Sequence, residues 1–207
     1  MALLSHHPFF LSHMPGRRPG GKRKNLFGHG RFRVAWLALL FVLTPFAESL
    51  RSAQYPTEQV KAVFLLNFAQ FVDWPANAFQ FETSSFIIGF VGDKDDPVLA
   101  ALEQLVRTEK VKKRPMAVVR FPDARSARNC HILYLAEGPT PSVRTFADLQ
   151  GRSILTIGET DDILKNGGVI RFITERKISL RINLKAAKSS RLVMSSKLLR
   201  LAEVVEY

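Results

Sequence analysis

The segment KAVFLLNFAQFVDWP, residues 61–75, carries the strongest structural signal in the chain. Its apolar residues recur at helical spacing, yet they occur nearly all the way round the helix. A helix that is apolar on two sides must be covered on both, either by layers of its own domain or by a partner protein. The stripe expected to face the core consists of Val60, Val63, Phe64, Phe71 and Trp74, and a neighbouring flank consists of Leu65, Phe68 and Val72.

The second flank offers more apolar area than one core needs, and monomeric proteins seldom leave such area exposed as one patch. We therefore interpret it as the candidate surface for a partner protein or a second copy of the chain. The alternative is that a C-terminal helix covers it through Leu198 and Leu199. Asn67 lies among the apolar residues, where an unpaired amide is costly, so we expect it to hydrogen-bond to another element. Pro75 disfavours helical geometry at Trp74 and ends the helix.

The N-terminal residues have the features of a secretory signal. A run of basic residues in 17–33 is followed by the apolar run 34–47 and then by small residues around Ser49. The apolar run is shorter than the ~20 residues that a membrane-spanning helix needs. We predict a signal peptide at residues 1–49, cleaved near Ser49, and hence a periplasmic protein. Whether translation starts at Met1 or Met14 stays open.

Much of the positive charge belongs to this leader. The whole chain has a net charge of +12, and residues 1–49 hold seven of its 30 basic and one of its 18 acidic residues. The remaining 23 basic and 17 acidic residues give +6, so the charge does not indicate a nucleic-acid-binding protein. One basic cluster remains outside the leader, and we interpret it as a solvated turn rather than a phosphate-binding surface. It consists of Lys110, Lys112, Lys113 and Arg114.

The 158 residues after the leader are enough for one domain with a core of its own. They include a single cysteine, Cys130, so no internal disulfide can form. Its neighbours are apolar, which favours a buried, unreactive thiol. Dimerisation through Cys130 is the alternative.

Strands and helices alternate, which predicts an α/β fold: a single domain with a mixed sheet of about six strands, flanked by helices. Asp96 and Pro97 begin one helix, and Thr57 is expected to cap the first. The expected strands are 85–91, 114–121, 132–136, 154–157, 169–173 and 178–183. The expected helices after the first are 98–107, 124–129, 141–149, a short one from Asp161 or Asp162, one through Lys188, and 197–205.

The last two strands are joined by only four residues, too few for a helical crossover, so they must form an antiparallel hairpin. Gly167 and Gly168 end the short helix before them in left-handed geometry. Asn183 is expected to cap the helix that follows, and Ser195 or Ser196 the final helix.

The residues give no indication of an enzyme. His131 is the single histidine after the leader, and it directly follows Cys130. Neighbours on a strand point to opposite faces, so the two side chains cannot act together. Zinc sites need more cysteine and histidine ligands than are present, and no phosphate-binding glycine loop occurs.

Two acidic loops leave one alternative open. They follow strands whose carboxyl ends should share one edge of the sheet, where α/β proteins bind ligands. Their carboxylates could hold a divalent cation, but we favour helix capping and solvated loop charges, with no metal and no cofactor. The residues concerned are Asp93, Asp95, Asp96, Glu159, Asp161 and Asp162.

From Tyr55 to Val205 the sequence resembles the YfiR-like periplasmic repressor family. The resemblance is carried by the first helix, by the strand FIIGFVGD and by the stretch GGVIRFITERKISLRINLKAAKSSRLVMSSKLLRLAEVV. Residues of the shared pattern that are expected to be structural are Asn67, Phe71, Trp74, Pro75, Gly167, Gly168, Asn183, Ser195 and Ser196. The pattern also includes Phe68, Ala69, Val72, Leu198 and Leu199.

The resemblance implies an exported, non-enzymatic signalling protein that binds and represses an inner-membrane partner. In the characterised type the partner is a diguanylate cyclase, so repression lowers cyclic-di-GMP and biofilm formation; a sensor kinase or a homodimer are the other partners considered. Some members have supporting disulfides, whereas this chain has only Cys130. The alternative function is a periplasmic small-ligand or metal-sensing module that uses the acidic loops.

Overall fold

The computed structural model describes residues 56–136, 138 and 141–207. The predicted signal peptide, residues 1–49, lies outside them. Among the helices that are described, none combines the length and the apolar character that crossing a bilayer requires.

An eight-stranded mixed sheet forms the centre of the described domain, with the strand order β10-β8-β7-β6-β5-β2-β4-β3. The five neighbouring strands β7, β6, β5, β2 and β4 are parallel. β8 runs antiparallel to β7, β3 runs antiparallel to β4, and β10 is parallel to β8. The strands are β2 (Phe86–Val91), β3 (Lys110–Val111), β4 (Arg114–Arg120), β5 (Ile132–Leu135), β6 (Leu155–Gly158), β7 (Ile170–Thr174), β8 (Ile178–Asn183) and β10 (Ala202–Val205). A separate antiparallel pair joins β1 (Val72–Asp73) to β9 (Val193–Met194).

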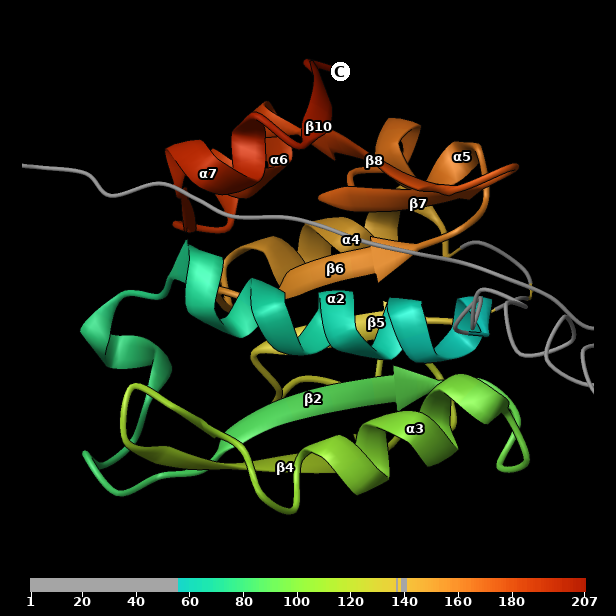
Figure 1. Cartoon of the computed structure of the whole chain (residues 1–207). Helices are drawn as coiled ribbons and strands as arrows, with labels where there is room; N and C mark the ends of the chain where they lie inside the picture. Colours follow the sequence, from blue (N-terminus) through green and yellow to red (C-terminus); the bar gives the residue numbers. More distant parts are fainter. Residues whose placement is uncertain (1–55, 137, 139–140) are drawn as a thin grey trace, which may run out of the picture. The chain divides into compact units, whose positions relative to one another are not determined.

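Helices cover both faces of the sheet. On one face, α2 and α3 lie side by side in front of the strands (Figure 1), and α6 and α7 extend the same hydrophobic core. On the other face, α4 and α5 pack over a second, smaller core. The helices are α2 (Thr57–Phe71), the 3-10 helix η1 (Ala76–Ala78), α3 (Pro97–Leu105), α4 (Val143–Gln150), α5 (Asp162–Lys165), α6 (Leu184–Ser189) and α7 (Ser196–Leu199).

The predicted α/β class, the mixed sheet and the antiparallel hairpin of β7 and β8 are confirmed. Three predicted caps are confirmed as well. Asp96 accepts a hydrogen bond from Val98 N at 2.7 Å, Asn183 from Ala186 N at 3.1 Å, and Ser195 from Leu198 N at 3.2 Å. Thr57, by contrast, is the first residue of α2 rather than its cap, because Pro56 occupies the cap position.

The predicted left-handed glycine geometry after α5 is confirmed at Gly167 but not at Gly168. Gly167 has a φ of 103°, in the left-handed region. A Cβ atom at Gly168 would lie 2.8 Å from the carbonyl oxygen of Ile163, so this turn needs glycine at both positions.

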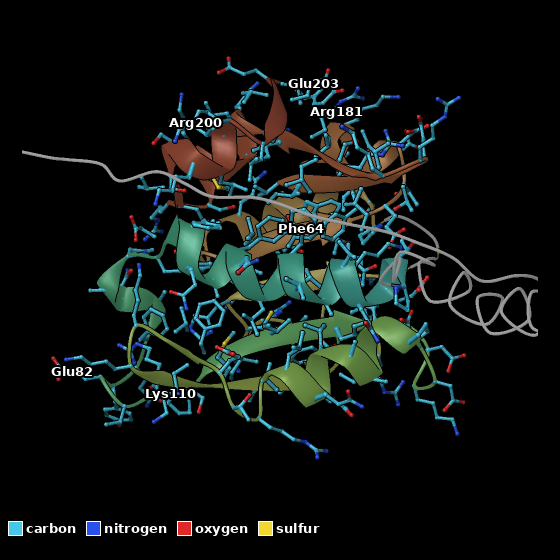
Figure 2. The ribbon with its side chains drawn as sticks, viewed as in Figure 1. Phe64, Glu82, Lys110, Arg181, Arg200 and Glu203 are labelled. Atoms are coloured by element: carbon cyan, nitrogen blue, oxygen red, sulfur yellow. The ribbon has the colours of Figure 1, made fainter. Side chains whose placement is uncertain are left out.

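Two predicted helices are wrong. Residues 124–129 form turns without a helix. The final helix ends at Leu199 instead of Val205, and Ala202–Val205 form the edge strand β10. The β-branched pair Val204 and Val205 favours a strand, and the Arg181 guanidinium on β8 donates two hydrogen bonds, of 2.9 and 2.7 Å, to Glu203 (Figure 2).

Candidate interaction site

The predicted partner-binding flank of α2 lies in the core. The exposed fractions of Leu65, Phe68 and Val72 are 0%, 1% and 0%. Phe68 stacks on Phe172 of β7 with ring centroids 6.0 Å apart. The prediction that this flank is free for a partner is therefore wrong: the helix faces the sheet with it, and α7 also contacts α2.

The opposite side of α2 is the one that solvent reaches. Val63, expected in the core, has an exposed fraction of 45%. Together with Val60 it lines a groove of about 520 Å³ between α2 and α3. Ala101 and Leu105 of α3 form the other wall of this groove.

The polar residues of the α2–α3 groove are the amides Gln59 and Gln104, and no charged residue lines it. An apolar groove between two helices can accept an apolar side chain or a helix of another protein. The groove of Gln59, Val60, Val63, Ala101, Gln104 and Leu105 is therefore the candidate interaction site, called here the α2–α3 groove.

A buried ionic network anchors the N-terminal half of α2. Lys61 donates hydrogen bonds of 2.8 Å to both carboxylate oxygens of Glu159, and the Tyr134 hydroxyl donates to the same carboxylate. Arg171 Nε donates to the Glu159 carbonyl at 3.2 Å and pairs with Asp161. Lys61 and Glu159 thus neutralise each other's charge, and their ion pair joins α2 to the sheet.

The acidic loops do not come together at a common site. Asp93 lines a cleft with Asp123, whereas Glu159 lies in a different cleft with Lys61. In the described part of the chain, no group of three or more histidine, cysteine or carboxylate side chains is arranged to hold a metal ion. Asp96 acts as a cap, but Asp161 makes no cap bond and Glu159 belongs to the ionic network rather than to a solvated loop.

His131 and Cys130 are both structural. The His131 ring is stacked between Phe79 and Phe86, at centroid distances of 4.4 and 4.7 Å. Its Nδ1 accepts from Ile87 N at 3.0 Å, and Nε2 lies 3.2 Å from the Ala78 carbonyl oxygen, so the neutral ring uses both nitrogens. Burial is the main reason that the pKa of His131 is lowered.

The predicted buried thiol is confirmed. Cys130 lies in the smaller core, on the other face from the His131 ring, and its Sγ donates to the Ala127 carbonyl at 3.5 Å. Burial raises the pKa of the Cys130 thiol to about 12. The nucleophilic thiolate is therefore suppressed at neutral pH.

Two polar predictions need correction. The Asn67 side chain is half-buried and, within the described residues, has no hydrogen bond to another element. Its amide is not among fully buried polar atoms without a partner, so it is open to solvent. In the basic cluster the three lysines are solvated as expected, but Arg114 is not. Its guanidinium lies 4.0 Å from the Phe79 ring centroid and donates to the Phe81 and Ser84 carbonyls.

Other residues of the family pattern join elements. Trp74 Nε1 donates to the His131 carbonyl at 3.2 Å, and its ring packs edge-on against Phe86. The Phe71 carbonyl accepts from Ser195 N at 2.9 Å. Pro75 caps η1, and the second Asn183 bond reaches the Leu164 carbonyl at 3.0 Å. The sequence does not predict that four polar residues join elements: Lys61, Glu159, Tyr134 and Arg114. The one available signal is a lysine within an apolar helix.

Comparisons with known proteins give one family match. The profile described as YfiR/HmsC-like matches residues 58–203. A solved structure titled a conserved domain protein from Vibrio cholerae O1 biovar El Tor strain N16961 is similar, with a TM-score of 0.41 and 13% sequence identity. The similarity covers 72% of this chain and 60% of that one, so it spans less than two thirds of the solved chain. No match was found among curated proteins.

Proposed function

Because the chain belongs to the YfiR/HmsC-like family, we propose that it is an exported repressor of an inner-membrane diguanylate cyclase. The family consists of periplasmic, non-enzymatic regulators of such cyclases. Repression of the cyclase lowers cyclic-di-GMP and, with it, biofilm formation. The family match over residues 58–203 is the observation that carries this proposal.

The α2–α3 groove is the surface we propose for the partner. It is apolar, it lacks charged residues, and Val63 projects there with almost half of its surface exposed. Apolar side chains of a partner would lose water on entering it, which favours association in proportion to the area buried. A second copy of the chain could use the same surface, so self-association has to be measured alongside capture of the partner.

Repression on this basis is a shift of a conformational equilibrium. A protein that binds two states of a cyclase equally well cannot change their ratio. The repressor must therefore bind an inactive conformation of the periplasmic part of the cyclase more tightly than the active one. No catalytic residue is needed for this role.

A pull-down from solubilised membranes tests the surface. Val63→Glu places a charge in the groove, where partner burial would desolvate it, so capture of the cyclase should fall at least tenfold. Val143→Glu is the matched control, because Val143 is exposed to 61% on α4 at the other face of the sheet. Both variants should melt close to the wild type, since neither valine is buried. Equal capture by both variants would exclude the groove, and failure of the wild type to capture any cyclase would exclude the function.

We further propose that residues 1–49 are a signal peptide that is removed on export, leaving the domain of residues 55–207. Mass spectrometry of the protein recovered from the periplasm should find an N-terminus near Leu50. A full-length chain that stays with the membrane fraction would contradict this proposal.

A further inference from the structure

A second groove opens at the opposite end of the strands from the acidic loops. Its volume is about 730 Å³, within the range of small-molecule sites. The walls come from segments that enter the amino ends of β2, β5 and β6, from η1 and from the turn after α6. The lining residues used below are Arg128, Cys130, His131, Arg152, Ser153 and Arg191.

The charges of this groove are all of one sign. Arg128, Arg152 and Arg191 line it, and no aspartate or glutamate does. Within the described residues, none of the three arginines forms an ion pair. The two clefts at the carboxyl ends of the strands differ, because carboxylates stand in the walls of both. Arg128 Nε donates to the Arg125 carbonyl at 3.1 Å, which leaves its charge without a counterion. Three guanidinium groups that no carboxylate neutralises, around one hollow, raise the local concentration of anions.

Cys130 and His131, which also line the groove, carry no negative charge that would neutralise the arginines. Cys130 stays a neutral thiol because burial raises its pKa to about 12. His131 is neutral and uses both ring nitrogens in bonds to backbone groups. Recognition of a ligand therefore falls to the arginines and to the neighbouring amide and hydroxyl groups.

The backbone at the rim is strained at two of the lining positions. Ser153 and Arg191 have φ values of 58° and 54°, in the left-handed region that is unfavourable for a non-glycine residue. Arg191 directly follows the cap residue of α6, the place where glycine is the usual choice. Its guanidinium donates one bond, to the Gly151 carbonyl at 3.4 Å, and its other donors remain available.

We propose that this groove binds a small oxyanion with two or more negative charges, carried by phosphate or carboxylate groups. Planar guanidinium groups bind both kinds of oxyanion through paired hydrogen bonds. Arginines from three separate segments suit a ligand whose charges are spaced apart better than a single monovalent ion. This site is separate from the α2–α3 groove, so the two proposals can fail independently.

Titration calorimetry of the purified protein with pyrophosphate and with citrate, at constant ionic strength, tests the proposal. We expect saturable binding of at least one of them; the ratio of their affinities distinguishes phosphate from carboxylate recognition. The variant Arg152→Gln/Arg191→Gly should bind at least tenfold more weakly. It should melt no lower than the wild type, because glycine adopts the backbone geometry of position 191 without strain.

The matched control is Arg176→Gln, which removes the same kind of charge from the hairpin between β7 and β8, at the opposite end of the strands from this groove. It should bind within twofold of the wild type. Equal weakening by the groove and control variants would show a general charge effect and overturn the site. Absence of binding by both probes would overturn it as well. Arg152→Gln alone, at an exposed side chain, gives the same test if the double variant does not fold.

Discussion

Single side chains determine how the layers of this domain meet, and His131 is the clearest case. It directly precedes β5, and its ring lies between Phe79 and Phe86 while its nitrogens bond to the backbone of Ile87 and Ala78. A protonated ring would have no acceptor for the Ile87 N–H. The histidine therefore contributes to stability only in its neutral form.

Stability should fall in acid because of this histidine. The unfolded chain has a histidine pKa near 6.5, and burial lowers the folded value. Between the two pKa values the unfolded state binds a proton and the folded state does not. The contribution of His131 to the free energy of unfolding is therefore complete above pH 6.5 and is lost as the pH falls through the folded pKa. Urea denaturation at pH 7.5 and 5.5 should show a larger loss for the wild type than for His131→Phe. Parallel losses would contradict the assignment, whatever the stability of the variant at pH 7.5.

The Lys61–Glu159 pair makes a second prediction at this scale. Lys61→Met leaves the Glu159 carboxylate without its cation in a site that is largely closed to water, which should cost about 3 kcal/mol. Adding Glu159→Gln removes the stranded charge and should recover most of that loss. Free energies of unfolding for the two single variants and the double variant measure the coupling. Additive effects would show that the pair is not energetically linked.

At the scale of elements, α2 shows where sequence reasoning succeeds and where it stops. Its helical period and its burial on one face by the sheet follow from the sequence. Which of two apolar stripes faces the sheet does not, because both have the right spacing. The inward face is the one with the small residues Ala62 and Ala69, which let the helix approach the strands closely.

Paired phenylalanine variants check this orientation. Phe68→Ala should destabilise the domain by about 3–5 kcal/mol, since it empties a fully buried site. Phe81→Ala is the control, because Phe81 is exposed to 63%, and it should change stability by less than about 0.5 kcal/mol. Thermal or urea unfolding distinguishes them. Similar losses for the two variants would mean that Phe68 is not in the core.

At the scale of the whole molecule, the alternation of strands and helices was enough to predict the class, the mixed sheet and the hairpin. The sequence does not predict the two edge strands β3 and β10, because β3 has only two residues and the residues of β10 continue the spacing of the preceding helix. The α2–α3 groove and the arginine-lined groove of Arg128, Arg152 and Arg191 cannot be predicted from the sequence for another reason. Each is built from segments distant in the sequence, and their meeting depends on strand order, which local patterns do not encode.

Removal of β10 tests the role of the sheet edge. Deleting residues 201–207 uncovers the ladder groups of β8 and separates Arg181 from Glu203. An open strand edge promotes pairing between molecules, so the truncated protein should associate, as seen by light scattering. Deleting only residues 206–207, which lie beyond β10, should leave a monodisperse protein. Equal behaviour of the two truncations would show that β10 does not protect the edge.

The contacts between α2 and the C-terminal segment also govern when the chain can fold. α2 needs β8 and α7 to close its apolar face, β1 pairs with β9, and Phe71 bonds to Ser195. Contacts between such distant parts of a chain form late, because the long loop between them must close first. α2 therefore cannot reach its final environment until synthesis of the domain is nearly complete. Late assembly of this kind suits a chain that, as proposed above, crosses the membrane before it folds.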